Sequence, residues 1–542
     1  MQMESQVYDF IVIGSGFGGS VSALRLAEKG YTVLVLERGR RFSDEGFPKT
    51  NWDVRRYLWA PRARCFGFLQ MSFFRGLLVL HGSGVGGGSL GYAGVLMAPD
   101  PAFFSAPGWA GLADWEQELR PHFATARRML GVAQNPRLWV ADETMRALAT
   151  KAGRQETFRP TDVGVFFGEP GEEVQDPYFG GKGPARRGCI HCGGCMVGCR
   201  YNAKNTLVKN YLYLAEQRGV QVLPEAKVVD LRPIDGAEQA GARYRVGYRR
   251  TSAWLPGQRR TLLARNVVVA AGVLGTLELL LQARDVAKTL PRLSARLGEN
   301  ARTNSEDLLG VTRRSNGVDF SEGIAISSGF KADDHTFVEP VRYARGSSFM
   351  RLMATPMIEA GESVMIRLAR TVSAILRAPL DFLSTSVRRG WAERTTIVLV
   401  MQQLDNRMRV RYVRRPWKLM RHGLVIEHDR QARIPSVINQ GHRIAREFAT
   451  MVGGVPQGSF MEGLLNMPIT AHILGGVPMG RNDSEGVIDR TCGVFNYPGL
   501  FVVDGSVVPA NPGINPTLTI TALAEYAMAQ IPEAGASGYH GE

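Results

Sequence analysis

The chain has 542 residues, more than one hydrophobic core can organise, so two closely associated domains are expected. Hydrophobic residues make up 44% of the chain and charged residues 21%, as in an ordinary globular protein, and no run of about 18 apolar residues predicts a transmembrane helix. The formal net charge is +15, yet no nucleic-acid-binding fold is recognisable, which argues against DNA or RNA as a partner.

The first 37 residues predict a strand–helix–strand unit. Asp9–Ile13 is a short apolar run typical of a buried parallel strand, and Ser20–Lys29 carries apolar residues at helical spacing. Thr32–Leu36 is a second strand that ends at Glu37. The polar start of the chain, Met1–Tyr8, has no secretory signal, so a cytoplasmic location is expected.

Three glycines join this first strand to its helix in the pattern Gly14-x-Gly16-x-x-Gly19. Gly14 permits a tight turn, Gly16 lets the backbone approach a pyrophosphate, and Gly19 lets the helix pack closely on the strand. The helix N-terminus then faces the phosphate charge. Glu37 stands where an acid can hydrogen-bond ribose hydroxyls. The unit predicts a dinucleotide-binding site without distinguishing FAD from NAD.

Further pieces of the same domain recur along the chain. Buried strands are predicted at Val220–Leu223, Asn266–Ala271 and Leu500–Val503, and helices at Asp114–Leu130, Asn205–Gln217 and Thr519–Gln530. Asp504 follows the last strand, at the edge where ligands of open α/β sheets bind.

These pieces predict an α/β fold in which a second, α+β substrate domain is inserted into a Rossmann-type domain. The Rossmann-type domain is assigned residues 1–130, 205–310 and 466–542, and the substrate domain 131–204 and 311–465. A mostly antiparallel sheet is expected in the substrate domain, from β-like stretches at Phe337–Val341, Thr396–Met401 and Met408–Val413.

Four of the six cysteines form a run with the spacing of bacterial ferredoxins, Cys189-x-x-Cys192-x-x-Cys195-x-x-x-Cys199. Glycines within the run let the loop wrap, so that the thiolates can converge on one metal centre. Three interpretations stay open: an iron–sulfur cluster, a structural zinc site, or unmetallated thiols. Disulfides are disfavoured in a cytosolic chain. Cys65 and Cys492 are expected to be buried structural residues.

Positive charge is concentrated between Arg367 and Arg421, where 13 Arg or Lys residues stand against three acids. Such a run fits an anionic membrane surface or a partner protein, and equally a solvated basic face. Within it, Val364–Arg389 interleaves arginines with apolar residues. The pattern predicts a membrane-surface helix or an ordinary helix covering a sheet, and the ordinary helix is preferred.

The sequence resembles the glucose–methanol–choline (GMC) flavoprotein oxidoreductases, and within them the bacterial cholesterol oxidase branch. Five segments carry the resemblance, in the family's order: YDFIVIGSGFGGSVSALRLAEKG, GSGVGGGSLGYAG, NVVVAAGVLGT, AHILGGVPMG and FVVDGSVVPANPGINPTLTITALAE. They lie between residues 8 and 525, so the resemblance frames nearly the whole chain, while the middle is less similar.

The resemblance implies FAD as the cofactor. It assigns the ADP part to Gly14, Gly16, Gly19 and Glu37. It places the flavin beside a second glycine loop, Gly84, Gly86, Gly87, Gly88 and Ser89. Asp504, Gly505, Asn515, Pro516 and Thr517 close over the pyrophosphate and the isoalloxazine. Some GMC dehydrogenases also hold an iron–sulfur cluster in a Cys-rich loop, which CMVGCRYNA resembles.

The catalytic pair that the resemblance carries over is His472 and Asn515. An imidazole can position the substrate hydroxyl and accept or relay its proton near neutral pH. The Asn515 amide can donate a hydrogen bond as charge develops on oxygen.

The chain departs from the cholesterol oxidase pattern at one point. Those enzymes carry a Glu base that isomerises the steroid double bond, and the stretch aligned with it here, 346–357, has no Glu. Glu339 is nearby in sequence, but the alignment does not place it in the site. The sequence therefore argues against an isomerase step and against cholesterol itself as the substrate.

The leading hypothesis is an FAD-dependent oxidoreductase that takes a hydride from the CH–OH group of a lipophilic, sterol-like alcohol. Electrons would pass to oxygen or, through an iron–sulfur cluster, to another acceptor. An alternative of a different class is a flavin-carrying redox partner or binding protein that docks on a membrane or electron acceptor through residues 367–421 and oxidises no alcohol.

Overall fold

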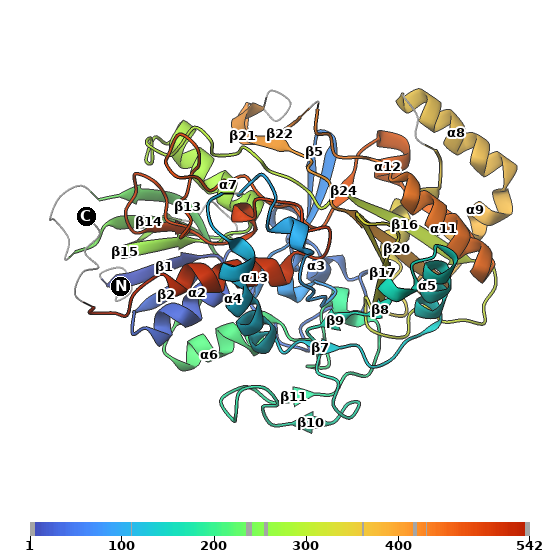
Figure 1. Cartoon of the computed structure of the whole chain (residues 1–542), viewed down its shortest axis with the longest axis horizontal. Coiled ribbons are helices and arrows are strands. Elements are labelled where there is room, and N and C mark those ends of the chain that lie inside the picture. The colour runs from blue at the N-terminus through green and yellow to red at the C-terminus, as the bar shows by residue number, and fades with distance from the viewer. Residues whose placement is uncertain are drawn as a thin grey trace.

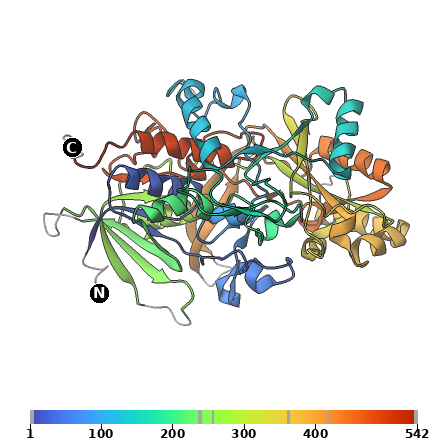
Figure 2. The same ribbon diagram turned by 90° about the horizontal axis from the view of Figure 1, so that it is seen from below.

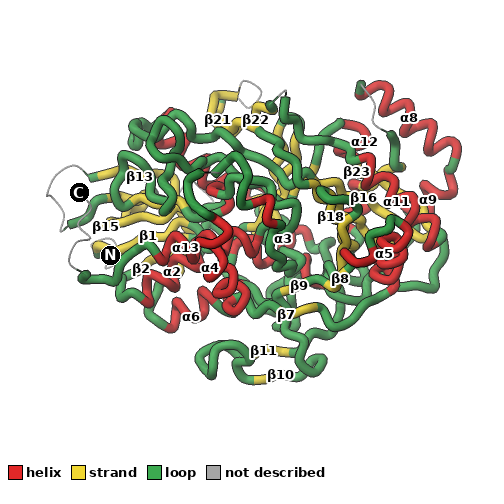
Figure 3. The backbone as a smooth tube through the Cα atoms, viewed as in Figure 1, coloured by secondary structure: helices red, strands yellow, loops and turns green. Residues whose placement is uncertain are grey.

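A computed structural model describes residues 6–109, 111–234, 241–253, 258–359, 363–415, 420–429 and 431–536. Two large sheets stand at opposite ends of the molecule, one mainly parallel and one antiparallel, as Figures 1 and 3 show. This arrangement confirms the predicted fold class. The proposed domain boundaries stay a prediction. The strands of the mainly parallel sheet come from the segments assigned to its domain, whereas one strand of the antiparallel sheet, Glu306–Arg313, crosses the proposed boundary at residue 310.

The first sheet has seven strands: β12 (Gln221–Leu223), β2 (Val33–Leu36), β1 (Val7–Ile13), β15 (Arg260–Val269), β14 (Tyr244–Arg250), β13 (Ala226–Pro233) and β25 (Leu500–Val502). β12, β2, β1, β15 and β25 pair in parallel. β13 and β14 pair with each other and with β15 in antiparallel fashion, as an addition to the parallel layer. Continuous burial along Phe10–Ile13 and Val33–Leu36 reflects helices and loops on both faces of a parallel sheet.

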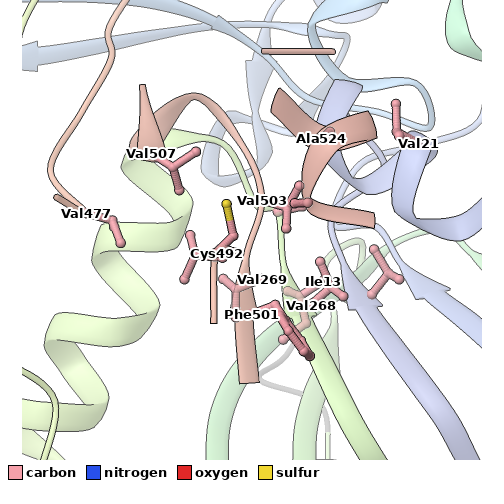
Figure 4. Close-up of a cluster of buried hydrophobic side chains, with 14 of the residues drawn as sticks. Ile13, Val21, Val268, Val269, Val477, Cys492, Phe501, Val503, Val507 and Ala524 are labelled. Atoms are coloured by element: carbon pink, nitrogen blue, oxygen red, sulfur yellow. The ribbon is translucent and has the colours of Figure 1, made fainter. Parts of the chain in front are cut away.

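The main helices of this half are α2 (Phe17–Glu28), α4 (Trp115–Met129), α6 (Tyr211–Gln217), α7 (Val273–Leu281) and α13 (Thr517–Ala529). α13 packs against both α2 and α4, so the C-terminal helix lies beside the first one. Figure 4 shows the core between them, where β1, β15 and β25 meet α2 and α13 through Ile13, Val268, Val269, Phe501, Val503, Val21 and Ala524. Cys492 is buried in the same core, as expected, whereas Cys65 is half-exposed and that expectation was wrong.

The second sheet is antiparallel throughout, in the order β19 (Ala354–Pro356), β23 (Gly454–Ser459), β16 (Glu306–Arg313), β20 (Thr395–Gln402), β18 (Thr336–Val341), β17 (Ser328–Lys331) and β8 (Arg159–Pro160). It packs against α5 (Val140–Lys151) and α11 (Asn439–Val452), and α12 (Phe460–Leu465) follows β23 directly. A smaller sheet joins the two halves, made of β5 (Leu69–Phe74), β6 (Leu77–Gly82) and β24 (Ile469–Thr470).

The basic run does not form one surface. Its first part makes α8 (Val364–Arg377) and α9 (Pro379–Ser386), which project beside the second sheet. Its last part makes the hairpin of β21 (Met408–Arg415) and β22 (Arg421–His428), which packs on α7 of the first half. The expectation that 408–413 joins the antiparallel sheet of the substrate domain was therefore wrong. Residues 416–419 lie outside the described part of the chain. In the described ranges, no helix combines the length and apolarity needed to cross a membrane.

Candidate active site

A cavity of about 880 Å³ runs from the N-terminus of α2 to the second sheet. Many residues picked out from the sequence line it together: Gly14, Gly16, Glu37, Gly87, Gly88, His472, Asp504, Gly505, Asn515, Pro516 and Thr517. Gly19, Gly84, Gly86 and Ser89 support its walls without lining it. Segments from the start, middle and end of the chain thus converge on one space.

The glycine turn before α2 fits a bound pyrophosphate. Gly14 has φ 101°, and a Cβ there would lie 2.2 Å from the carbonyl oxygen of Ala270. A Cβ on Gly19 would lie 2.0 Å from the Gly14 oxygen, so helix and strand need glycine to pack this closely. A Cβ on Gly16 would meet nothing within 4 Å, which leaves the backbone open to the cavity. The first turn of α2 holds no acid that would repel a phosphate.

Glu37 has a structural role that sequence reasoning missed. Its Oε2 accepts hydrogen bonds from the N–H (3.1 Å) and the hydroxyl (2.8 Å) of Ser15. Its Oε1 accepts the N–H of Gly39 (2.8 Å) and of Gly84 (3.3 Å). One carboxylate therefore holds both glycine loops together at the cavity wall, and its contact with a ribose stays a prediction.

The second glycine loop is tied to the cysteine loop by a buried lysine. The Nζ of Lys204 donates to the carbonyl oxygens of Leu90 (2.8 Å), Tyr92 (3.2 Å) and Cys195 (2.6 Å). Burial lowers the pKa of Lys204 to about 8, against the opposing effect of the nearby Cys195 and Cys199. Ser89 donates to the Gly86 oxygen at 2.6 Å and stabilises the turn. In the sequence Lys204 is only a lysine in a polar stretch, and nothing there indicates that it is buried.

The Nδ1 atom of His472 contacts Oε1 of Glu306 on β16. Glu306 is buried and its second oxygen accepts the N–H of Ala471 at 2.8 Å. Burial raises the pKa of Glu306, but His472 and the hydrogen bonds outweigh it and hold the pKa below its usual value. Because Nδ1 is engaged, Nε2 is the nitrogen that His472 offers to the cavity that it lines. Glu306 was absent from the predicted site, since nothing in its sequence surroundings marks it.

The segment that carries Asn515 is held by Asn304. The Asn304 amide donates to the Ile514 oxygen (2.9 Å), and its oxygen accepts the Gly513 N–H (3.1 Å). Asp504 accepts hydrogen bonds from the hydroxyls of Thr276 and Ser506, each at 2.5 Å. Burial raises its pKa. The loop over the predicted flavin site is thus fixed by buried polar groups on both sides.

Glu339 of β18 lies beside Asn515 but is not itself one of the residues that line the cavity. The sequence-based argument against an isomerase step stays a prediction. The side chain is fully buried, and burial raises its pKa to about 8 against the opposing contact with Asn515. Among the described residues, neither carboxyl oxygen accepts a hydrogen bond of ordinary geometry. A buried carboxyl without a fixed partner beside a predicted catalytic residue is a candidate for proton transfer.

The neighbour of Glu306 on β16 belongs to a second histidine–carboxylate cluster. His442 Nε2 lies 3.1 Å from Glu462 Oε1 and 3.8 Å from Asp307 Oδ2. All three side chains are buried and none lines the cavity. Burial raises the pKa of Asp307, and it raises that of Glu462 to about 7. This cluster lies behind the sheet, under α11 and α12.

The four clustered cysteines are all free thiols. Burial raises the pKa of Cys189 and Cys195 and raises that of Cys192 to about 11, and the thiols add to one another's shifts. Zn–S bonds of about 2.3 Å would put zinc-bound sulfurs about 3.8 Å apart. In the described part of the chain, no three ligand atoms including a cysteine sulfur lie within 4.8 Å of one another. The thiols as placed do not form a zinc site, and an iron–sulfur cluster stays a prediction.

Comparisons with known proteins agree with this geometry. A family model described as "FAD dependent oxidoreductase" matches residues 9–338, and one described as "GMC oxidoreductase" matches residues 439–524. A cholesterol oxidase from Mycobacterium tuberculosis is 46% identical, covering 97% of this chain and 92% of that protein. A cholesterol oxidase from Acinetobacter baumannii is 43% identical, covering 98% and 96%. The crystal structure of pyridoxine 4-oxidase from Mesorbium loti shares the fold, with TM-score 0.61, 15% identity and coverage of 96% and 99%.

The chain belongs to the GMC oxidoreductase family and is an FAD-dependent enzyme that acts on CH–OH donors. The residues present fit FAD, because the open backbone at Gly16 and the acid-free helix end suit a pyrophosphate. Family membership excludes the alternative of a flavin carrier without catalysis.

Proposed function

We propose that this enzyme oxidises the hydroxyl of a sterol-like, lipophilic alcohol. One observation carries the proposal: the His472–Glu306 pair stands in the wall of a cavity whose second-sheet end is apolar. The two relatives named cholesterol oxidase, identical at 46% and 43% of positions over nearly the whole chain, support the same substrate class.

The apolar end of the cavity is formed by side chains of the second sheet, of the turn 349–353 and of β24 in the smaller sheet: Leu308, Met350, Met353, Ile397, Leu399 and Ile469. A rigid hydrocarbon skeleton gains about 25 cal/mol for each Å² of apolar surface that it buries there. A sugar or a short diol would bury much less apolar surface against this wall. The lining therefore favours a large apolar alcohol.

His472 and Asn515 act on the hydroxyl end of such a substrate. His472 accepts the hydroxyl proton at Nε2, and Glu306 orients the ring and balances the positive charge that it gains. The Asn515 amide donates a hydrogen bond to the substrate oxygen. When bound, FAD supplies the hydride acceptor for the CH–OH carbon.

Glu339, which is not itself one of the cavity-lining residues, is proposed for a second reaction, movement of a double bond in the oxidised product. Its buried carboxyl lies beside Asn515, and its pKa of about 8 lets it both accept and return a proton near neutral pH. Isomerisation needs a base that takes a proton from the carbon next to the ketone carbonyl and returns it to a carbon of the double bond. The step is proposed for a steroid whose double bond lies near the oxidised carbon.

The electron acceptor is molecular oxygen or another acceptor reached through an iron–sulfur cluster in the cysteine loop. Met196 of that loop lines the cavity, and this supports a relay. Stoichiometric hydrogen peroxide under air, unchanged in Cys192→Ser, would indicate oxygen. Iron with acid-labile sulfide, and dye-linked turnover that Cys192→Ser abolishes, would indicate the relay.

The proposed cytoplasmic location is supported by the six free cysteines.

Turnover tests the proposed substrate. The purified yellow enzyme should oxidise a sterol and release flavin on denaturation, with KM for the sterol far below that for glucose or a short diol. Met353→Lys, which puts a charge in the apolar wall, should raise the sterol KM at least about tenfold. Met451→Lys, at an exposed position of α11, is the matched control and should leave KM unchanged. Equal KM values in the two variants would refute the sterol assignment.

A further inference from the structure

The helical pair α8–α9 presents its apolar side chains to solvent. Val364, Leu368, Val372 and Leu376 recur every four residues of α8, so they form one stripe. These four side chains are between 43% and 74% exposed. Leu380, at the start of α9, is 78% exposed. This corrects the preference for an ordinary helix that covers a sheet, because such a helix would bury this stripe.

The side of α8 that meets the protein is polar instead. Arg367 and Thr371 are its buried residues. Arg367 Nη1 donates to the carbonyl oxygen of Glu462 at 2.7 Å, and the Thr371 hydroxyl donates to the Arg367 oxygen at 2.9 Å. The helix is therefore anchored with its apolar stripe outward. Exposed apolar stripes of this size mark binding surfaces rather than ordinary solvent-facing helices.

Exposed arginines lie on α8 and in the residues that follow α9. Arg370, Arg377, Arg388 and Arg389 are exposed, while Asp381, the acid within α9, is paired with Arg314. Long arginine side chains can lie along an apolar surface and carry their charge to a lipid headgroup. A second copy of the chain would bring these arginines face to face with one another in a symmetric contact. An anionic lipid surface satisfies both the apolar stripe and the charge.

The stripe borders the apolar end of the cavity. α9 packs on the turn Phe349–Met353, where Met350 and Met353 line the cavity while Leu352 is 63% exposed. α8 packs on α12, whose first turn is capped by the cavity-lining Ser459 and whose Phe460 is 38% exposed. The turn 349–353 and the start of α12 therefore each contact the cavity on one side and the helices that carry the stripe on the other. Figures 1 and 2 show α8 and α9 at the outer end of the second sheet.

We propose that α8–α9 docks the enzyme on an anionic phospholipid bilayer, with the apolar stripe in the interface and the apolar end of the cavity next to the lipid. Docking itself is independent of the substrate. The consequence that the alcohol enters from the bilayer rests on the proposed function, because only a lipophilic substrate would be dissolved there.

Vesicle binding tests the docking. The full-length enzyme should co-sediment with phosphatidylcholine vesicles that contain phosphatidylserine. Leu376→Asp/Leu380→Asp should weaken binding at least about tenfold, since both side chains are exposed and their change leaves the core intact. Val174→Asp/Val286→Asp, at exposed positions remote from the stripe, adds the same charge and should bind like the wild type. The variant Arg377→Glu/Arg389→Glu should bind anionic vesicles more weakly, by about fivefold or more for each arginine replaced, and should bind neutral vesicles like the wild type.

Turnover separates the two proposals. Sterol in vesicles should be oxidised more slowly by Leu376→Asp/Leu380→Asp, while the same sterol in detergent micelles should be oxidised at the wild-type rate. Vesicle binding without sterol turnover would leave docking standing and refute the proposed function. Equal vesicle binding by the stripe variant and the wild type would overturn docking, as would a dimer that dissociates in the stripe variant and binds no vesicles.

Discussion

Two histidine–carboxylate clusters lie on either side of strand β16. Glu306 points to the cavity and pairs with His472, while the next residue, Asp307, points to the other face and joins His442 and Glu462. Both carboxylates are buried, yet the pKa of Glu306 is lowered and that of Asp307 is raised well above its usual value. The side-chain alternation of a strand separates them.

The difference lies in what surrounds each histidine. His472 faces one carboxylate and an open cavity, so Glu306 keeps its charge and Nε2 remains available to a substrate. His442 faces two carboxyls in a closed space, where burial favours the protonated form of both acids and the nearby Glu462 adds to this effect at Asp307. The same residue types therefore give a reactive pair on one face and a structural cluster on the other.

The largest expected effect is that of His472→Ala. Loss of the proton acceptor should lower kcat/KM for the alcohol by about 10²- to 10⁴-fold, while the flavin spectrum stays unchanged. His442→Ala is the matched control: turnover should persist, and unfolding free energy should fall by about 1–3 kcal/mol because buried acceptors lose a donor. Steady-state kinetics and denaturant unfolding measure both. Similar kinetic losses in the two variants would contradict the comparison.

Glu306→Gln should have the next largest effect. Without the charge that orients and stabilises the His472 ring, kcat should fall about 10- to 100-fold with little change in KM. Glu306→Asp, which keeps the charge, should restore part of kcat. A loss in KM alone, or no rescue by Asp, would show that Glu306 only supports the fold.

Glu339→Gln should change the oxidation rate less, by no more than about threefold, and remove double-bond isomerisation. In the wild type, isomerisation should rise with pH as the carboxyl, with its pKa of about 8, loses its proton. Spectroscopic detection of the conjugated ketone follows the step. Full isomerisation by the variant would exclude Glu339 as the base.

The smallest effect on turnover is expected from Glu462→Gln, which should act on stability alone. Its folded pKa of about 7 exceeds the usual 4.5, so the folded protein holds a proton that the unfolded chain releases. The contribution of Glu462 to the free energy of unfolding is fully present below pH 4.5 and is lost as the pH rises to about 7. In Glu462→Gln, which has no proton to lose, denaturant unfolding should show a smaller fall in the free energy of unfolding between pH 4.5 and 7. An identical pH profile in the variant would refute the assignment.

Much of the nucleotide-binding half was predictable because its signals are local. Gly14 needs a positive φ, the run Phe10–Ile13 is buried on both faces, and the order of the family segments identified FAD. His472 and Asn515 were found by resemblance and do line one cavity. Glu306 was missed, because no local pattern distinguishes a strand carboxylate that faces a cavity from one that faces the core. Glu339 was noticed in the sequence, but only the fold showed that it lies beside Asn515.

The sequence by itself determined the two kinds of sheet, the glycine turn and the amphipathic character of 364–389. Each depends on residues within a few positions of one another, whose backbone preferences and side-chain periodicity act locally. Only the tertiary structure decided which carboxylate meets which histidine, and whether the apolar stripe of α8 faces inward or outward. Those outcomes depend on how β16, α12 and α8 dock, since burial and electrostatic pairing arise between segments far apart in the chain.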